Sequence, residues 1–395
     1  MLGAIIGDIV GSRWEFNPTN DYDFELFSDK NSFTDDTICT VAVADALLHG
    51  SDDYGKYIHD WCRKYPHPMG GYGGRFSQWV MNDNPKPYGS FGNGSAMRVS
   101  PIGWWFDDRD EILEQASKTA SCTHNHPEGI KGAQTVALAI HYAYSLQDEI
   151  LYGTMDGIKE LMAYAVTFSG YDINIRKEDV CNKFDETCQG TVPVALWIIY
   201  HSKGFEDAIR QAVSLGADAD TLGAIVGSIA EAIWGIPEEL RKKAESYLPE
   251  EMLSIINDFY DNEQNHYAAL TKRKTADFAQ KYIYYFENEY GSPKSYYDFF
   301  DSSTFPKECW SLGFEMDCGH SFIKLYGQSA WNSKDGLSAI IDKINDVKVV
   351  GSALFSQWRY YNHWSYSHAT EDDRQWLLIL FRRLQQLVMP DNQAE

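Results

Sequence analysis

The chain of 395 residues is poor in basic side chains. Its 34 Lys and Arg residues stand against 57 Asp and Glu residues, which gives a formal net charge of −23 and a pI of about 4.8. A nucleic-acid-binding face needs a basic patch, so this balance argues against a nucleic-acid-binding protein. It leaves room for a local basic pocket that binds a phosphate.

Cysteine pairs, a basic leader and long apolar runs are also missing. The seven cysteines contain no Cys-x-x-Cys motif, and their odd number and dispersal favour reduced thiols in a cytoplasmic protein. No run approaches the roughly 18 apolar residues of a transmembrane helix, so we expect no membrane partner. The apolar stretch 2–10 lacks a basic leader and is interrupted by Asp8, which is not typical of a signal peptide.

Strand-like alternation is scarce in the first 285 residues. Apolar residues recur there at a spacing near 3.6, which predicts a mainly α domain. Glycines recur every four residues in 3–11, and Gly223 and Gly227 share one face of a later segment, so both segments predict close helix packing. The predicted helices span 38–49, 110–121, 130–146, 157–168, 191–202, 205–215, 220–234, 237–247 and 250–260.

The composition changes after about residue 290. A single core seldom grows far beyond about 250–300 residues, so a second domain is expected on length alone. We predict a first domain over 1–288 and a small α+β accessory domain over 289–395. Its strands are expected at 320–326 and 347–350, and a final helix at 372–387.

The accessory region contains an aromatic and basic stretch, 358–364. Such a stretch can stack a nucleotide base, although aromatic clusters more often belong to a core. The predicted roles of the region are therefore open: recognition of a modified protein, oligomerisation, or nucleotide binding.

Two acidic clusters about 180 residues apart carry the strongest chemical signal. They are Thr34-Asp35-Asp36-Thr37 and Asp218-Ala219-Asp220-Thr221, and each stands before an apolar helical run. Mg²⁺ and Mn²⁺ prefer oxygen ligands, so paired carboxylates and hydroxyls suit such an ion. The alternative is that the clusters only cap their helices, because acidic residues are common in a first helical turn.

Four further segments lie between or before the clusters. Glu15 stands between aromatic residues, where the pKa of a carboxyl group can rise enough for acid–base chemistry. The glycine-rich segment 70–74 offers backbone N–H groups to a phosphate. The segments 90–98 and 123–128 add hydroxyl, amide, guanidinium and imidazole groups. Each segment alone is equally typical of a turn or of structural side chains.

In this order, the motifs of residues 1–260 resemble those of the ADP-ribosylglycohydrolase family. The resemblance implies a compact all-α orthogonal bundle with two Mg²⁺ or Mn²⁺ ions in a cleft. It implies that Glu15 is the catalytic acid or base. The implied metal ligands are Thr34, Asp35, Asp36, Asp218, Asp220 and Thr221, and the implied substrate-binding residues are Gly71, Gly73, Ser90, Asn93 and His124.

The chain departs from the family pattern at three positions. Ala217 replaces a glycine and Leu222 replaces an asparagine beside the second cluster, which leaves every proposed ligand in place. Ser90 stands where some arginine-directed bacterial members have an aspartate. Its presence shifts the acid–base role toward Glu15.

The implied function is hydrolysis of the glycosidic bond of an ADP-ribosyl group on a protein or a small acceptor. Two alternatives stay open at this point: a metal-dependent phosphohydrolase, and a catalytically silent protein that binds ADP-ribose. The sequence names neither the acceptor and its linkage nor the oligomeric state. The net negative charge argues against a nucleic-acid partner, and binding through the accessory domain is the one possibility left open.

Overall fold

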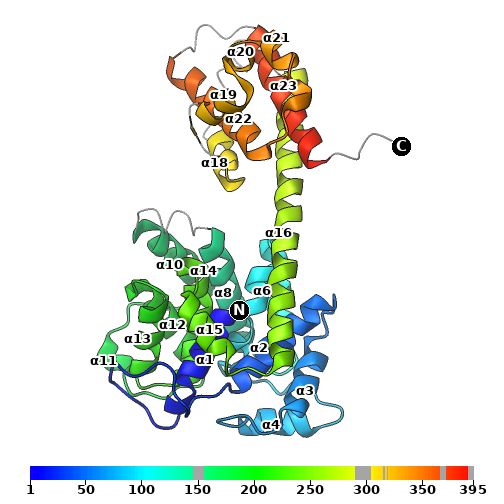
Figure 1. Ribbon diagram of the computed structural model, residues 1–395. Coiled ribbons are helices and arrows are strands. Elements are labelled where there is room, and N and C mark those ends of the chain that lie inside the picture. Colours follow the sequence, from blue (N-terminus) through cyan, green and yellow to red (C-terminus); the bar gives the residue numbers. More distant parts are fainter. Residues whose placement is uncertain (146–154, 290–303, 315, 318, 365–370, 390–395) are drawn as a thin grey trace. The chain divides into compact units, whose positions relative to one another are not determined.

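The computed structural model describes residues 1–145, 155–289, 304–314, 316–317, 319–364 and 371–389. These residues form two compact units, Met1–Glu263 and Gln264–Glu395, and each has a hydrophobic core of its own (Figure 1). The functional division that the sequence places between residues 288 and 289 stays a prediction.

The regular elements among the described residues of the first unit are all helices, which confirms the predicted all-α bundle. All nine helices predicted from apolar spacing are present: α2 (Asp35–Leu48), α7 (Arg109–Ser121), α8 (Pro127–Ser145), α10 (Met155–Ser169), α12 (Cys188–His201), α13 (Phe205–Ser214), α14 (Ala219–Trp234), α15 (Glu238–Glu245) and α16 (Glu250–Tyr284). The others are α1 (Leu2–Gly11), η1 (Ser12–Trp14), α3 (Tyr54–Lys64), α4 (Gly74–Met81), α5 (Gly94–Met97), α6 (Ser100–Trp105) and α11 (Lys177–Val180).

Helices α1 and α14 pack with their backbones in direct contact (Figure 1). A Cβ atom on Gly223 would lie 2.6 Å from the carbonyl oxygen of Gly7, and one on Gly7 would overlap the carbonyl oxygen of Gly223. Gly3 and Gly227 face each other in the same way one turn along. The predicted small-residue faces are therefore confirmed, and they meet each other.

Helix α14 is the central helix of this unit. Its residues from Ala219 to Ile233 are all buried, and α8, α12 and α13 pack against it in addition to α1. The helix ends at Gly235, whose φ of 68° lies in the left-handed region that glycine adopts without strain. The helices packed around α14 also bury its N-terminus, which carries the second acidic cluster.

The described part of the second unit is also helical, so the predicted α+β character of this region is wrong. It contains the end of α16, then η2 (Tyr285–Glu289), α18 (Thr304–Ser311), α19 (His320–Tyr326), α20 (Gln328–Asn332), α21 (Lys334–Ser338), η3 (Ile341–Lys343), α22 (Val347–Trp364) and α23 (Glu371–Val388). The final helix predicted at 372–387 is confirmed by α23.

Both predicted strands belong to helices for the same physical reason. The run 347–350 is the first turn of α22, in which every residue from Val350 to Gln357 is buried. In α19, Phe322 contacts Tyr326 four residues later. Burial of a helical face outweighs the weak strand preference of a short apolar or β-branched run.

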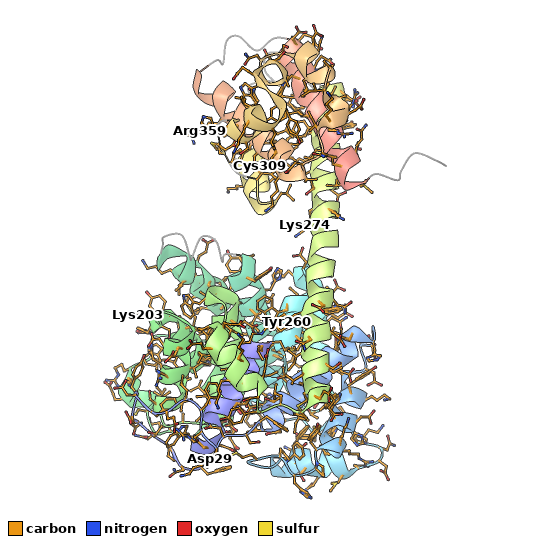
Figure 2. All side chains as sticks on the ribbon, in the orientation of Figure 1. Asp29, Lys203, Tyr260, Lys274, Cys309 and Arg359 are labelled. Carbon is orange, nitrogen blue, oxygen red and sulfur yellow. The ribbon has the colours of Figure 1, made fainter. Side chains whose placement is uncertain are left out.

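The aromatic and basic stretch lies in α22. Trp358 packs against the core of the second unit, while Arg359 is exposed and contacts the sulfur of Met316 (Figure 2). The side chains of 360–364 and the aromatic residues of 291–303 lie outside the described residues. In the described part of the chain, no helix combines the length and the hydropathy that crossing a membrane requires.

The contact between α1 and α14 generates a stability prediction. Gly7→Ala places a methyl group against the backbone of Gly223, so the helices must separate and unfolding becomes easier by roughly 1–3 kcal/mol or more. Denaturant unfolding measures this change. The control is Gly74→Ala at the first position of α4, where no atom lies within 4 Å of the added Cβ. Equal unfolding midpoints for the two variants would contradict the packing described here.

Candidate metal centre and substrate cleft

The first acidic cluster begins helix α2. The Thr34 hydroxyl caps this helix by accepting the backbone N–H of Asp36 at 3.2 Å, and Asp35 and Asp36 occupy its first turn. The capping interpretation is therefore correct for Thr34. It does not account for Asp36, whose carboxylate is buried and whose Oδ2 has no hydrogen-bond partner among the described residues. A buried carboxylate oxygen without a partner is costly, and a bound cation would remove that cost.

Asp8 of α1 holds the first cluster in place. Its buried carboxylate accepts four hydrogen bonds, two from Thr34 and two from Thr37, each through the backbone N–H and the side-chain hydroxyl. The Thr34 hydroxyl donates to Asp8 at 2.7 Å and accepts from Asp36. One lone pair of its oxygen then remains for a cation.

The second acidic cluster begins α14. Asp218 occupies the N-cap position and Asp220 the first turn, and both carboxylates are buried. The side-chain amide of Asn93 donates to Asp218 Oδ2 at 2.7 Å and to the Thr191 hydroxyl at 3.1 Å. Asn93 therefore orients Asp218, and its side-chain amide is already engaged in these two hydrogen bonds.

The structure brings the two clusters together. The Thr221 hydroxyl donates to Asp36 Oδ1 at 3.4 Å, which joins residues 185 positions apart in the chain. Carboxylate oxygens of Asp8, Asp36 and Asp220 lie within 4.8 Å of one another. Those of Glu15, Asp218 and Asp220 form a second such group. The two groups share Asp220.

Glu15 directly follows η1, the short helix after α1. Its carboxylate lies beside those of Asp218 and Asp220. Glu15 is half-buried, and its Oε2 is buried without a hydrogen-bond partner among the described residues. Burial, followed by the negative charge of Asp218, raises the pKa of Glu15 to about 7. Gly70 passes so close that a Cβ there would overlap Glu15 Oε2, and its φ of 77° also favours glycine.

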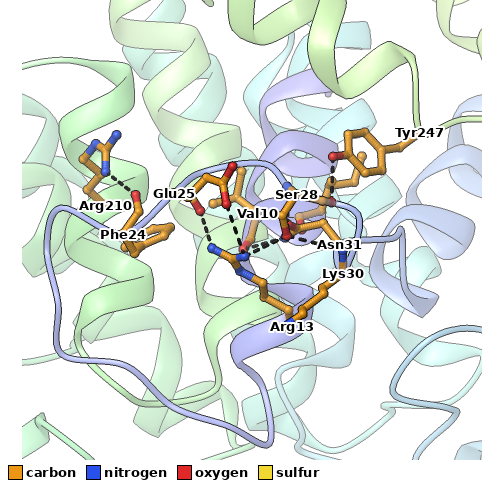
Figure 3. A network of polar contacts seen from close by, with 10 residues as sticks. Val10, Arg13, Phe24, Glu25, Ser28, Lys30, Asn31, Arg210 and Tyr247 are labelled. Atoms are coloured by element: carbon orange, nitrogen blue, oxygen red, sulfur yellow. Dashed lines mark hydrogen bonds and ion pairs between the residues drawn. The ribbon is translucent and has the colours of Figure 1, made fainter.

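A network of polar contacts anchors the segment between Glu15 and Thr34, which lacks regular secondary structure (Figure 3). The Arg13 guanidinium donates to the Ser28 hydroxyl at 2.7 Å and to the backbone carbonyl of Glu25. The Asn31 side chain donates to the carbonyl oxygens of Ile9 and Val10 at the end of α1.

Two residues from later helices complete this network. Arg210 of α13 donates to the carbonyl oxygen of Phe24 at 2.8 Å, and the Tyr247 hydroxyl donates to that of Ser28 at 2.9 Å (Figure 3). The long connection is therefore fixed at several points. Glu15 and the first cluster, which lie at its two ends, are fixed with it.

Four acidic residues line a cleft of about 450 Å³: Glu15, Asp35, Asp218 and Asp220. The predicted phosphate-binding segment, residues 70–74, forms one wall of this cleft. A Cβ atom added to Gly71 or Gly73 would have no neighbouring atom within 4 Å. Tyr72 between them is anchored, because its hydroxyl donates to the carbonyl oxygen of Tyr65 at 2.6 Å. A wall of glycine backbone admits close approach by a ligand.

The opposite wall contains the other predicted substrate-binding residues, Ser90, Asn93 and His124. The backbone from 91 to 93 pairs with that from 186 to 188 through an isolated bridge between Gly92 and Thr187. The Asn93 N–H donates to the carbonyl of Glu186 at 2.6 Å. The twelve site residues predicted from the sequence lie in the two acidic clusters or along this cleft.

Six carboxyl groups crowd the site: Asp8, Glu15, Asp35, Asp36, Asp218 and Asp220. Burial raises their pKa values, to about 6 for Asp8 and Asp218 and to about 8 for Asp35. The pKa values of Asp36 and Asp220 rise well above the ordinary range, first through burial and then through their acidic neighbours. Divalent cations would neutralise this charge, so the donor set fits Mg²⁺ or Mn²⁺.

Three residues of the site are absent from the predicted site residues. Asp8 had a usable signal, because a lone carboxylate within the apolar face of a close-packing helix requires an explanation. Arg98 lines the cleft although its side chain is almost wholly buried. Glu186 lies on the cleft and contributes to the raised pKa of Glu15, but nothing in its local sequence separates it from surface acids.

Comparison with known proteins agrees with this geometry. The sequence profile described as ADP-ribosylglycohydrolase matches residues 1–269. Similar proteins include ADP-ribosylarginine hydrolase Tri1 of Pseudomonas putida, 27% identical over 62% of this chain and 73% of its own length. Human ADP-ribosylhydrolase ARH3 is 24% identical over 64% of this chain and 90% of its own.

Among solved structures, an ADP-ribosylglycohydrolase-related protein complex aligns with a TM-score of 0.49 and 26% identity, over 66% of this chain and 95% of that one. The profile match spans more than half of the chain and contains every residue of the carboxylate site and the cleft. The chain therefore belongs to the ADP-ribosylglycohydrolase family of enzymes.

Proposed function

We propose that this protein hydrolyses the glycosidic bond of an ADP-ribosyl group with the help of two divalent cations, Mg²⁺ or Mn²⁺, and releases ADP-ribose from a protein or a small acceptor. The observation that carries the proposal is the pair of carboxylate groups that share Asp220, which lines the cleft. The Tri1 and ARH3 relatives, named as hydrolases of ADP-ribosyl groups, support the same reaction.

Six side chains would hold the cations: Thr34, Asp35, Asp36, Asp218, Asp220 and Thr221. The helix N-termini of α2 and α14 add partial positive charge beside these carboxylates, which helps to keep them ionised. When bound, the cations supply positive charge that orients and polarises oxygen atoms of the ribose and of water. Asp8 acts indirectly, because its hydrogen bonds orient Thr34 and Thr37.

Glu15 is the proposed proton carrier. Cleavage at an anomeric carbon proceeds through a transition state with oxocarbenium character, and a proton must move between the attacking water, the enzyme and the leaving group. Glu15 lies on the cleft beside Asp218 and Asp220, and a pKa near 7 lets it both accept and release a proton around neutral pH. The surrounding carboxylates lack this access because they are the proposed cation ligands.

The glycine wall and the opposite wall would hold the rest of the ADP-ribosyl group. The backbone at Gly71 and Gly73 lines the cleft with no atom within 4 Å of an added Cβ, so a diphosphate can approach it without a side-chain clash, although the Gly71 N–H itself donates to the carbonyl oxygen of Pro68 at 3.1 Å. Ser90 and His124 offer polar atoms from the other side. Fixing the substrate at both walls places the anomeric carbon beside Glu15 before the chemical step.

The first test concerns the cation ligands. Asp36→Asn and Asp220→Asn each remove one negative charge from the shared groups, so cation affinity should fall by at least about 100-fold and release of ADP-ribose should be lost. Calorimetric titration with Mn²⁺ and chromatography of the reaction products measure the two effects. Asp110→Asn is the matched control, because Asp110 takes the same second position in α7 but is exposed.

Wild-type Mn²⁺ affinity in either cleft variant would overturn the ligand assignment. Products also separate the proposed reaction from phosphohydrolysis, because a glycosidic cleavage releases intact ADP-ribose. Release of AMP or phosphate by the wild-type protein would point to the other reaction.

The second test concerns Glu15. Glu15→Gln keeps the size of the side chain and removes its acid–base function, so we expect unchanged Mn²⁺ binding and a kcat lowered roughly 10²–10⁴-fold. Steady-state hydrolysis of an ADP-ribosylated substrate measures the change. Glu25→Gln in the same connecting segment is exposed and should behave as wild type. A Glu15→Gln protein that turns over at the wild-type rate would remove Glu15 from the mechanism.

A further inference from the structure

Arg98 and His124 are linked by the hydroxyl of Thr123. Arg98 Nη2 donates to Thr123 Oγ1 at 2.8 Å and to the carbonyl oxygen of Thr119 at 2.8 Å. Thr123 Oγ1 lies 2.7 Å from His124 Nδ1. All four side chains are buried, so water does not compete for these contacts.

The direction of the hydrogen bond between Thr123 and His124 follows from the available acceptors. A threonine hydroxyl has one proton, and Arg98 can only donate, so that proton must point elsewhere. Its two neighbours are His124 Nδ1 at 2.7 Å and the Cys122 sulfur at 3.9 Å. The imidazole nitrogen is both the nearer and the stronger acceptor. Thr123 therefore donates to Nδ1, and the ring proton of neutral His124 lies on Nε2.

The Nε2 atom faces the cleft above Gly92. The point where a Cβ on Gly92 would lie is 3.5 Å from His124 Nε2, 3.3 Å from Ser90 Oγ and 3.3 Å from the backbone carbonyl oxygen of Glu186. Ser90 Oγ accepts the N–H of Gly92 at 3.1 Å, which leaves its own proton to donate into the cleft. The carbonyl oxygen of Thr123 also accepts the N–H of Ser90 at 3.4 Å. Thr123 therefore contacts both Ser90 and His124.

We propose that Arg98 and Thr123 are positioning residues that fix His124 in the tautomer with its proton on Nε2. That proton and the Ser90 hydroxyl then form a pair of donors that converge on one oxygen atom of the bound ligand above Gly92. His124 thus binds as a neutral donor and takes no part in proton transfer. The identity of the ligand, an ADP-ribosyl group, rests on the proposed function, whereas the tautomer does not.

Charge supports the donor role. Burial, and then the positive charge of Arg98, lowers the pKa of His124 well below its usual range, so the ring stays neutral at physiological pH. A neutral imidazole with Nδ1 occupied has only the Nε2 proton to offer. A ribose hydroxyl matches this space, because its oxygen accepts from both donors and its own proton can be donated to the nearby carbonyl oxygen of Glu186.

The tautomer can be measured directly on the metal-free protein. Protein labelled with ¹⁵N-histidine gives long-range proton–nitrogen spectra in which the two neutral tautomers differ, and the His124 signals are those lost in His124→Gln. We expect the Nε2-protonated form in wild type and in Thr123→Ser. In Thr123→Val, which removes the hydroxyl, we expect a mixture or the Nδ1-protonated form. An Nδ1-protonated His124 in wild type, or an unchanged tautomer in Thr123→Val, would overturn the proposal.

Binding of ADP-ribose, measured by calorimetry, tests the second half. Loss of an aligned donor to the ligand oxygen should weaken binding about tenfold in Thr123→Val, and Thr123→Ser should restore it. Thr135→Val is the matched control, because this buried hydroxyl bonds only within α8, to the carbonyl oxygen of Lys131. A changed tautomer with unchanged affinity would overturn the donor pair. A wild-type protein without affinity for ADP-ribose would instead contradict the proposed function.

Discussion

The direct backbone contact between α1 and α14 is the constraint on which the rest of the first unit depends. Glycines at matching intervals remove the side chains that would hold the two helices apart. At the end of the contact, a Cβ on Gly11 would lie 2.6 Å from the Cα atom of Asp220. Asp8 on α1 and the second acidic cluster on α14 are therefore neighbours because the helix backbones touch.

The same contact determines the electrostatics of the site. It forces buried carboxylates into a space where water cannot separate them, and burial raises the pKa of each one. Three observations support the proposal that cations complete the arrangement: the unpartnered oxygen of Asp36, the oxygen left free on Thr34, and the shared position of Asp220. Cation binding would also stabilise the folded protein, because the unfolded chain has no such site.

Much of the first unit could be predicted from its sequence. Helical spacing of apolar residues identified nine of its helices, and the two acidic clusters indicated the proposed metal site, because short motifs at helix starts carry their chemistry locally. Asp8 was missed because its hydrogen bonds to Thr34 and Thr37 span 26 and 29 positions in the chain. Arg98 and Thr123 were missed for a related reason: their effect on His124 depends on distances that no local pattern encodes.

The second unit was predicted less well. Short apolar stretches such as 320–326 and 347–350 have too few residues to separate a strand from the first turn of a helix by spacing alone. The deciding term there is burial against distant helices, as for Val350 in the core formed with α23. For the role of the second unit, the three predictions of partner recognition, oligomerisation and nucleotide binding stay open.

The central claim is that two cations held between α2 and α14 are required for cleavage at the anomeric carbon. The most direct measurement follows the release of intact ADP-ribose by protein stripped with EDTA, during stepwise addition of Mn²⁺ with the bound metal counted in parallel. The account predicts no release without metal, and full release once two ions are bound per chain. Activity that survives EDTA, or that is complete with no metal bound, would contradict it.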